Sequence, residues 1–474
     1  MAHRSFLSVA LLLVAGGICA APEAAWAGAG QRFPSERKVV RDEATGRDLV
    51  VLTDGKASDA KIYQTHRQWT ADNEWVVFRS GTRGGAGSQA YAVHERDGTI
   101  VQLTEGDGNN TSSLCVAKKS MKLYFLRNAT AHERSPTTVP APAPATTAPA
   151  ATAPAATQAA KEPPSEYQLI ELDLASLLAD ATRDAPKPAS AYERVCYTFP
   201  AGGLRPGGGA ALDADEGVFY VSAGGGDVGT HLPPGTPIWQ KRPGDRMGTG
   251  PAGLRAIDLR AGTLRVVIDA PFQIGHVQVN PWVPGEIVYC HETGGDAPQR
   301  MWTVRADGTG NRPLFEEQPS DWVTHETVVT KDEVMFNLIG HEPRLRARPT
   351  GIAVVNLRTN AVQLLGQIDE RDQLRAAATQ PSTQPAKDSF GGFWHCNGSA
   401  DGRWAVGDTF RGDLWAIDRR DGRRVLLSVD HKMKPDHLHP TFSDDGTRVL
   451  VQSGKFTDGQ RLQIVVVPVT EPAR

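Results

Sequence analysis

Six histidines of this chain have the spacing that chemistry at a shared site would need. Five of them each open a short apolar segment that is followed by a polar turn: His66, His276, His325, His395 and His439. His437 lies two residues before His439, so on a β-strand both side chains would point to the same face. Neutral imidazoles bind divalent transition metals, accept protons near neutral pH and orient polar ligands. The pattern therefore predicts a metal site, a general base or both.

A plainer interpretation is that these histidines only hydrogen-bond neighbouring loops. One or two histidines would fit that role. Six are harder to ascribe to packing, because adjacent imidazoles repel when protonated and need partners when buried. We therefore favour the functional interpretation.

The residue types suggest a division of roles within this set. His437 and His439 offer two ring nitrogens at a chelating spacing, and His325 or His395 could add a third from a neighbouring segment. The other histidines could act as a base or orient a substrate, which is the role expected for His66. Candidate anion-binding residues are Arg255, Arg300 and Arg411. Of these we expect Arg300 to contact the substrate, together with His66 and His395.

The histidine segments belong to a unit that repeats along the chain. After His66, His395 and His439, a hydroxyl residue stands four positions later and an Asp six positions later. Where no insertion intervenes, the units follow one another at intervals of 44 to 49 residues, the length of one four-stranded propeller blade. Seven first strands start near these residues: His66, Ser113, Gly209, His276, His325, His395 and His439.

This repeat predicts an all-β fold, a seven-bladed β-propeller. A β-sandwich or two separate domains would explain seven units of this length less easily. The last unit lacks a fourth strand, which the segment 38–53 could supply and so close the ring. In a propeller the first strands line the central channel, so histidines at one register would lie at one depth.

The chain outside the repeat contains three other kinds of segment. Residues 1–27, with Arg4 before an apolar run and Ala25-Trp26-Ala27 at the end, are typical of a secretory signal peptide, which predicts a periplasmic or secreted protein. The run is short for a membrane anchor. Residues 28–474 are expected to form one propeller, with low-complexity insertions near 134–164 and 376–387. A third excursion, 224–253, is rich in Gly and Pro.

Composition excludes several classes of partner. The net charge is -3 and the isoelectric point is about 6.5, so no nucleic-acid partner is expected. No segment after residue 27 is long and apolar enough to span a membrane. Four cysteines remain in the mature chain and none forms a CxxC pair, so no zinc–thiolate site is predicted. Disulfides and buried free thiols both stay open for Cys115, Cys196, Cys290 and Cys396, as does the oligomeric state.

Several of these segments resemble the oligogalacturonate lyases, polysaccharide lyase family 22. The run from His276 to Val304 and the triplet Thr324-His325-Glu326 are similar to two neighbouring blades of that family. Asp436-His437-Leu438-His439-Pro440 resembles its His-x-His-Pro segment, and Tyr63-Gln64 its first blade. The resemblance runs over most of residues 38–470. It implies a seven-bladed propeller, Mn²⁺ or another divalent transition metal, and β-elimination on an acidic, uronate-containing oligosaccharide.

The resemblance also implies roles for single residues. His325, His437 and His439 would bind the metal, and His276 would be the catalytic histidine that takes the C5 proton. Arg255 is the nearest counterpart of the family's catalytic arginine in blade three. Lys434 stands where the family has a glutamine as fourth metal ligand, so water, His395 or another side chain would have to replace it. Departures of this kind indicate a divergent member.

Three functional hypotheses follow. The first is a metal-dependent lyase of the cell envelope. The second is a non-catalytic, TolB-like periplasmic propeller that serves as a binding module, since the Ser-x-Asp-Gly turns at Ser399 and Ser443 are similar in both. The third is a metal-dependent hydrolase or epimerase on the same fold. The histidines favour the first, because a scaffold has no need of a metal cluster.

Overall fold

The computed structural model describes residues 28–84, 87–133, 165–368 and 392–469. The predicted signal peptide and both low-complexity insertions lie outside the described residues. Within the described residues, no helix is long and apolar enough to cross a membrane.

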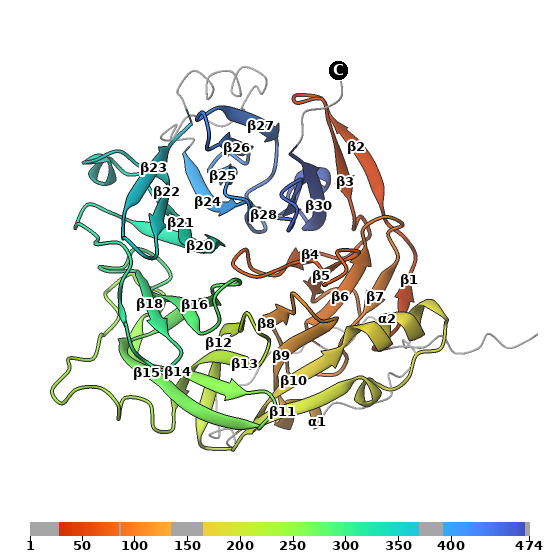
Figure 1. Cartoon of the computed structure of the whole chain (residues 1–474). Helices are drawn as coiled ribbons and strands as arrows, with labels where there is room; N and C mark the ends of the chain where they lie inside the picture. The colour runs from red at the N-terminus through yellow and green to blue at the C-terminus, as the bar shows by residue number, and fades with distance from the viewer. Residues whose placement is uncertain (1–27, 85–86, 134–164, 369–391, 470–474) are drawn as a thin grey trace, which may run out of the picture.

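Seven β-sheets surround a common axis, as the repeat predicts (Figure 1). Each sheet is an antiparallel blade, and its first strand lies nearest the axis (Figure 1). The inner strands of blades 1 to 7 are β4 (Asp59–Lys61), β8 (Asn109–Val116), β12 (Leu204–Leu212), β16 (Ile274–Val279), β20 (Val323–Thr330), β24 (Phe393–Gly398) and β28 (Thr441–Phe442).

The remaining strands complete the blades outward from the axis. Blades 1 to 3 continue with β5 (Trp75–Ser80), β6 (Gln89–His94), β7 (Ile100–Gln102) and β1 (Arg32–Phe33); β9 (Lys122–Asn128), β10 (Tyr167–Asp173) and β11 (Glu193–Phe199); and β13 (Val218–Gly225), β14 (Thr249–Asp258) and β15 (Thr263–Phe272). Blades 4 to 6 continue with β17 (Glu286–His291), β18 (Met301–Arg305) and β19 (Arg312–Pro313); β21 (Glu333–Leu338), β22 (Gly351–Asn356) and β23 (Val362–Gly366); and β25 (Trp404–Thr409), β26 (Leu414–Asp418) and β27 (Arg424–Ser428).

The N-terminal segment closes the ring. Blade 7 continues with β29 (Arg448–Ser453) and β30 (Gln463–Pro468), and β30 then pairs with β3 (Arg47–Val51), which pairs with β2 (Lys38–Asp42). The expected contribution of segment 38–53 is confirmed, but it supplies two strands rather than one. The segment before it also supplies β1, which pairs with β7 of blade 1.

Helices are few and lie outside the blades. The helices are α1 (Ala129–Glu133) and α2 (Leu174–Thr182), with short 3-10 turns η1 (Ala189–Ala191), η2 (Pro343–Arg346) and η3 (Lys455–Thr457). The blade repeat does not predict α2, which is capped by Asp173, whose carboxylate accepts the backbone N–H of Ser176.

The hydrophobic core lies between adjacent blades, because each sheet is covered on both faces. Met335 of blade 5, for example, packs with Phe393 and Trp415 of blade 6. Four cysteines are buried as free thiols in this core: Cys115, Cys196, Cys290 and Cys396.

The hydroxyl and Asp of the repeat have a structural role. Ser399 Oγ donates to Asp401 Oδ1 over 2.5 Å and accepts the backbone N–H of Trp404. Ser443 Oγ donates to Asp445 Oδ1 in the same way, over 2.6 Å. These bonds close the turn between the first and second strands of a blade. The motif therefore marks the blade and performs no chemistry.

Candidate functional site

Three histidines interrupt their inner strands in the same way. His276, His325 and His439 have φ angles of 43°, 58° and 50°, in the left-handed region that residues other than Gly seldom adopt. The strand register breaks at His276 in β16 and at His325 in β20. Such bulges re-aim a side chain, and strained conformations of this kind cost about 1–3 kcal/mol each. The fold therefore holds these imidazoles at the axis against a local strain.

Blades 5, 6 and 7 bring four imidazoles into one cluster. The ring of His395 lies 4.0 Å from that of His325, 4.1 Å from that of His439 and 5.3 Å from that of His437, measured between centroids. The three residues expected to bind a metal thus lie together. His395, which we expected to contact substrate, lies between them with 1% of its surface exposed.

The hydrogen bonds of this cluster prepare ring nitrogens for a metal. His325 Nδ1 lies 2.5 Å from the carbonyl oxygen of Trp394, and His395 Nδ1 lies 3.0 Å from both carboxylate oxygens of Asp408. Carbonyl and carboxylate oxygens only accept, so each Nδ1 carries the proton and each Nε2 keeps its lone pair. Metal-binding histidines are usually oriented in this way. His439 Nδ1 is buried without a hydrogen-bond partner among the described residues.

Burial keeps these imidazoles neutral, the form that binds metals. It lowers the pKa of His325 and of His395 well below the ordinary value, and the neighbouring histidines lower both further. The pKa of His439 is also lowered by burial, although Asp436 opposes the shift. The donor chemistry of His325, His395 and His439 therefore fits a divalent transition metal.

His437 and Lys434 are less suited to that role. His437 Nδ1 accepts the indole N–H of Trp394, so its lone pair is in use and its Nε2 carries the proton. Lys434, at the position where the family has glutamine, is exposed. His395, whose Nε2 is left free by the hydrogen bonds of Nδ1 to Asp408, can take their place as a metal ligand.

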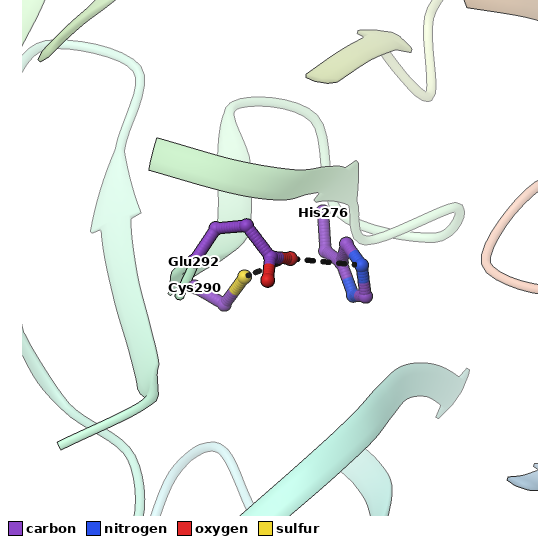
Figure 2. Close-up of side chains that lie close together, drawn as sticks. All are labelled: His276, Cys290 and Glu292. Carbon is purple, nitrogen blue, oxygen red and sulfur yellow. Dashed lines mark hydrogen bonds and ion pairs between the residues drawn. The ribbon is translucent and has the colours of Figure 1, made fainter. Parts of the chain in front are cut away.

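His276 is held by charged groups on both sides, of which Figure 2 shows Glu292. Its Nδ1 lies 3.2 Å from Glu326 Oε1, and its Nε2 lies 3.2 Å from Glu292 Oε2. Arg300 joins the network, with Nε 2.9 Å from Glu326 Oε2 and Nη2 3.1 Å from His276 Nδ1. The buried Glu326 lies on the core side, whereas Glu292 lines a cavity. His276 is therefore oriented from behind and faces open space.

Both carboxylates of this network are ionised at neutral pH. Burial alone would raise the pKa of Glu326 and of Glu292. The charge of Arg300 and the interaction with His276 outweigh burial and lower both pKa values.

Cys290 lies beside Glu292, with Sγ 3.7 Å from Oε2 (Figure 2). In the part of the chain that the structure describes, His276, Cys290 and Glu292 are the one set of three such residues whose ligand atoms all lie within 4.8 Å of one another. Burial raises the pKa of the Cys290 thiol well above its usual range, so it stays protonated, and the Arg300 guanidinium lies 3.7 Å from Glu292. This set fits a metal poorly and suits an oriented base. The four-histidine cluster has the donor chemistry that a transition metal needs, but its ring nitrogens would have to move closer together to bind one ion.

A cavity of about 630 Å³ opens beside His276. Blades 1 to 4 line it, whereas the four-histidine cluster belongs to blades 5 to 7. Tyr63 connects them, because its ring lies 4.8 Å from that of His276 and 5.2 Å from that of His439. The volume is in the range of small-ligand sites.

The arginines are arranged differently from our expectation. Arg255 is fully buried and paired with Asp269 over 2.8 Å and Asp227 over 3.0 Å, and it does not line the cavity. Arg300 is 2% exposed and is engaged by acids. Arg79, which the sequence did not single out, does line the cavity. The one feature of the sequence that could have pointed to Arg79 is its charge within the otherwise apolar strand Trp75–Ser80.

His66 lines the cavity as expected, but its ring nitrogens already have protein partners. Nε2 lies 2.6 Å from the carbonyl oxygen of Ala210, and Nδ1 lies 2.8 Å from Thr65 Oγ1. His66 therefore shapes the wall rather than offering a free nitrogen.

Fold and site together define a seven-bladed propeller that carries a histidine cluster and an adjoining cavity on its axis. A solved structure of an oligogalacturonate lyase in complex with manganese has this fold, with a TM-score of 0.64 and 18% identity, and the match covers 93% of this chain and 98% of that chain. An oligogalacturonate lyase of Vibrio parahaemolyticus also has a TM-score of 0.64 and 18% identity, over 93% of this chain and 99% of that chain. No family model matches the chain, and no curated protein matches it in sequence. The resemblance seen in the sequence is thus confirmed at the level of the fold.

Proposed function

We propose that this protein is a metal-dependent lyase that cleaves uronate-containing oligosaccharides by β-elimination. The observation that carries the proposal is His276, oriented by the buried Glu326 and facing a cavity beside the four-histidine cluster. A base, a cavity and a set of neutral metal-binding imidazoles are the parts that proton abstraction next to a carboxylate needs. The fold shared with two oligogalacturonate lyases agrees with this chemistry.

His276 is the base in this proposal. In the tautomer that acts as a base, Nδ1 carries the proton and donates it to Glu326 Oε1, 3.2 Å away, and Nε2 keeps its lone pair. Arg300 Nη2, 3.1 Å from the same Nδ1, does not donate to the ring in this tautomer, and Arg300 is held by Glu326 instead. Nε2 takes the proton from C5 of the uronate, and the ionised Glu292 stabilises the imidazolium that forms. Glu292 and Glu326 would thus hold the base in place before and after proton transfer.

His325, His395 and His439 would hold the metal, with His437 beside them. A divalent metal there would supply a Lewis acid for the C6 carboxylate and stabilise the negative charge that develops as the proton leaves. We propose Mn²⁺ or another divalent transition metal, because imidazole suits this group of ions.

Tyr63 is suited to protonate the leaving oxygen. Its hydroxyl makes no hydrogen bond to the described residues, and its ring lies between His276 and His439. Burial and the charge of Glu326 raise its pKa, so it remains a proton donor. The electron pair of the C5–H bond forms the C4=C5 double bond as the C4–O bond breaks. Solvent then returns the proton from His276 to Tyr63.

The test is product formation together with metal content. Galacturonate oligomers incubated with the purified protein should yield a product with the ultraviolet absorbance of an unsaturated uronate, and the protein should contain about one transition-metal ion. The His276→Ala protein should keep fold and metal and lose about 10²–10⁴-fold in turnover. Cleavage without that absorbance would indicate a hydrolase. A protein with neither metal nor turnover, even after addition of Mn²⁺, would indicate a binding module.

We also propose that the protein acts in the periplasm or outside the cell, on the basis of the pattern in residues 1–27. The mass of the protein recovered from these fractions should correspond to a chain that starts at Gly28. An intact N-terminus would contradict this localisation.

A further inference from the structure

The cavity beside His276 contains one guanidinium group. Among the described residues that line it, Arg79 is the one Lys or Arg, and Glu292 is the one carboxylate. A negatively charged substrate cannot place a carboxylate beside Glu292 without repulsion. Its recognition within the cavity therefore falls to Arg79.

Arg79 has few partners of its own. Nη1 donates to Ser112 Oγ over 3.2 Å, whereas Nε is buried without a hydrogen-bond partner. Within the described part of the chain it forms no ion pair. Four residues further on, Arg83 is paired with both Glu36 and Asp59, and Arg300 and Arg255 also have carboxylate partners. Arg83, Arg255 and Arg300 are thus neutralised by carboxylates, whereas the half-buried Arg79 has no carboxylate partner among the described residues.

An unpaired guanidinium in such a position is costly. Burial lowers the pKa of Arg79, and the field of Asp436 offsets the shift only in part. That carboxylate is itself engaged, since Oδ2 accepts from Gln452 over 2.9 Å and Oδ1 lies 3.5 Å from His439 Nε2. A cost of this kind is typical of a residue whose partner is a ligand.

The wall next to Arg79 is shaped to leave room. Gly207, Gly208 and Gly209 of β12 line the cavity where the pairing of β12 with β13 is interrupted. A Cβ on Gly208 would come within 4.0 Å of Ser112 Cβ, and one on Gly207 would lie 2.7 Å from Ser222 Oγ. Blade 3 therefore carries no side chain at the register where other blades carry histidines, which lets a ligand approach closely.

We propose that Arg79, together with Ser112, binds a carboxylate of the uronate oligosaccharide and so selects acidic over neutral chains. Arg79 belongs to blade 1 and His276 to blade 4, so the ligand would span the cavity between them. The surroundings of Arg79 indicate that it binds an anion. The identification of that anion as a uronate rests on the proposed function. A planar guanidinium with free N–H groups matches a carboxylate in two-point contact.

Calorimetric binding tests this inference without turnover. Trigalacturonate and the neutral galactotriose are titrated into the His276→Ala protein with and without Arg79→Gln. We expect Arg79→Gln to weaken trigalacturonate binding about 10- to 100-fold and to leave galactotriose unaffected. Arg79→Lys should lose less affinity for trigalacturonate, because lysine keeps the positive charge but not the two-point contact of the guanidinium. The control is Arg305→Gln, an exposed arginine outside the cavity, which should change neither affinity.

Thermal unfolding guards against loss of structure. Without ligand, Arg79→Gln should unfold at the same temperature as its parent or higher, because a half-buried charge with no carboxylate partner among the described residues is removed. Equal affinity of the parent and Arg79→Gln proteins for trigalacturonate would overturn the Arg79 site and leave the lyase proposal standing. Absence of trigalacturonate binding by the parent would overturn both.

Discussion

Single residues show what a sequence can and cannot say about this site. Histidine is informative because five of them share one register and His437 lies two residues before the last of these, and four of the six meet in one cluster. The arginines are not, because an arginine's role depends on whether a carboxylate lies next to it. Arg300 forms an ion pair with Glu326, and Arg255 forms one with Asp269, and both pairs are recognisable only in the folded structure. Arg79 becomes a candidate only because no acid reaches it within the described residues.

The proposed proton donor makes a prediction about the leaving group. Tyr63→Phe removes the hydroxyl and keeps the ring between His276 and His439. Turnover of galacturonate oligomers should fall about 10²–10⁴-fold, the range of general acid–base catalysis. A 4-fluoro uronate substrate, whose leaving fluoride needs little protonation, should retain most of its rate. Equal losses on both substrates would rule out a role in proton donation.

The hydrogen bonds of the cluster predict which histidines bind the metal. His395→Ala should lower Mn²⁺ affinity by at least 100-fold, because Asp408 holds its Nε2 lone pair free for the ion. His437→Ala should have a smaller effect, because its Nδ1 accepts from Trp394. Equilibrium dialysis with metal analysis measures both without reference to activity. A larger loss for His437→Ala would restore the ligand set implied by the family resemblance.

At the scale of elements, the blade repeat was predictable because each blade repeats one turn and one apolar rhythm. The contribution of segment 38–53 to blade 7 was predictable as well, because the last unit lacks a fourth strand. Its division into two strands was not predictable, and neither was β1, which is only two residues long. Helix α2 follows a local cap at Asp173 within blade 2, a signal that the repeat obscures. The inner-strand bulges escaped prediction as well, since His276, His325 and His439 adopt φ angles that histidines seldom take.

Ring closure predicts where the fold is most sensitive. Leu49 of β3 is fully buried in the core between blades 6 and 7. Leu49→Ala should lower the free energy of unfolding by about 2–5 kcal/mol, through lost burial and a cavity. The matched control is Leu364→Ala in β23, where the side chain is 38% exposed and the loss should be less than about 1 kcal/mol. Urea denaturation measures both, and equal losses would show that the N-terminal strands do not hold the ring together.

On the scale of the whole molecule, the ring divides into two functional parts. Blades 5 to 7 supply the four-histidine cluster, and blades 1 to 4 supply the cavity with His276 and Arg79. Neither part exists within one blade, so the site depends on closure of the entire ring. Burial lowers the pKa of His325, His395 and His439, which couples the stability of the fold to pH.

Because several histidines are buried, we expect the free energy of unfolding to fall in mild acid. Burial lowers the pKa of His291 to about 4 and that of His431 to about 3, whereas in the unfolded chain both titrate near 6.5. Below that pH the unfolded state binds more protons than the folded state, so each such group removes about 1.4 kcal/mol of stability per pH unit until its folded pKa is reached. Carboxylates with lowered pKa, such as Glu171 at about 2, add their loss only below about 4.5.

His431 isolates this effect away from the proposed site. It is 2% exposed and hydrogen-bonds Ser428 and Ser453. With His431→Gln, the number of protons bound by the unfolded state exceeds that bound by the folded state by one fewer. The slope of unfolding free energy between pH 6 and 4, measured by urea denaturation, should therefore decrease by about 1.4 kcal/mol per pH unit. The same substitution at the exposed His231 is the control. If His431→Gln left the slope unchanged, or if both variants changed it equally, burial of His431 would not be a source of the acid sensitivity.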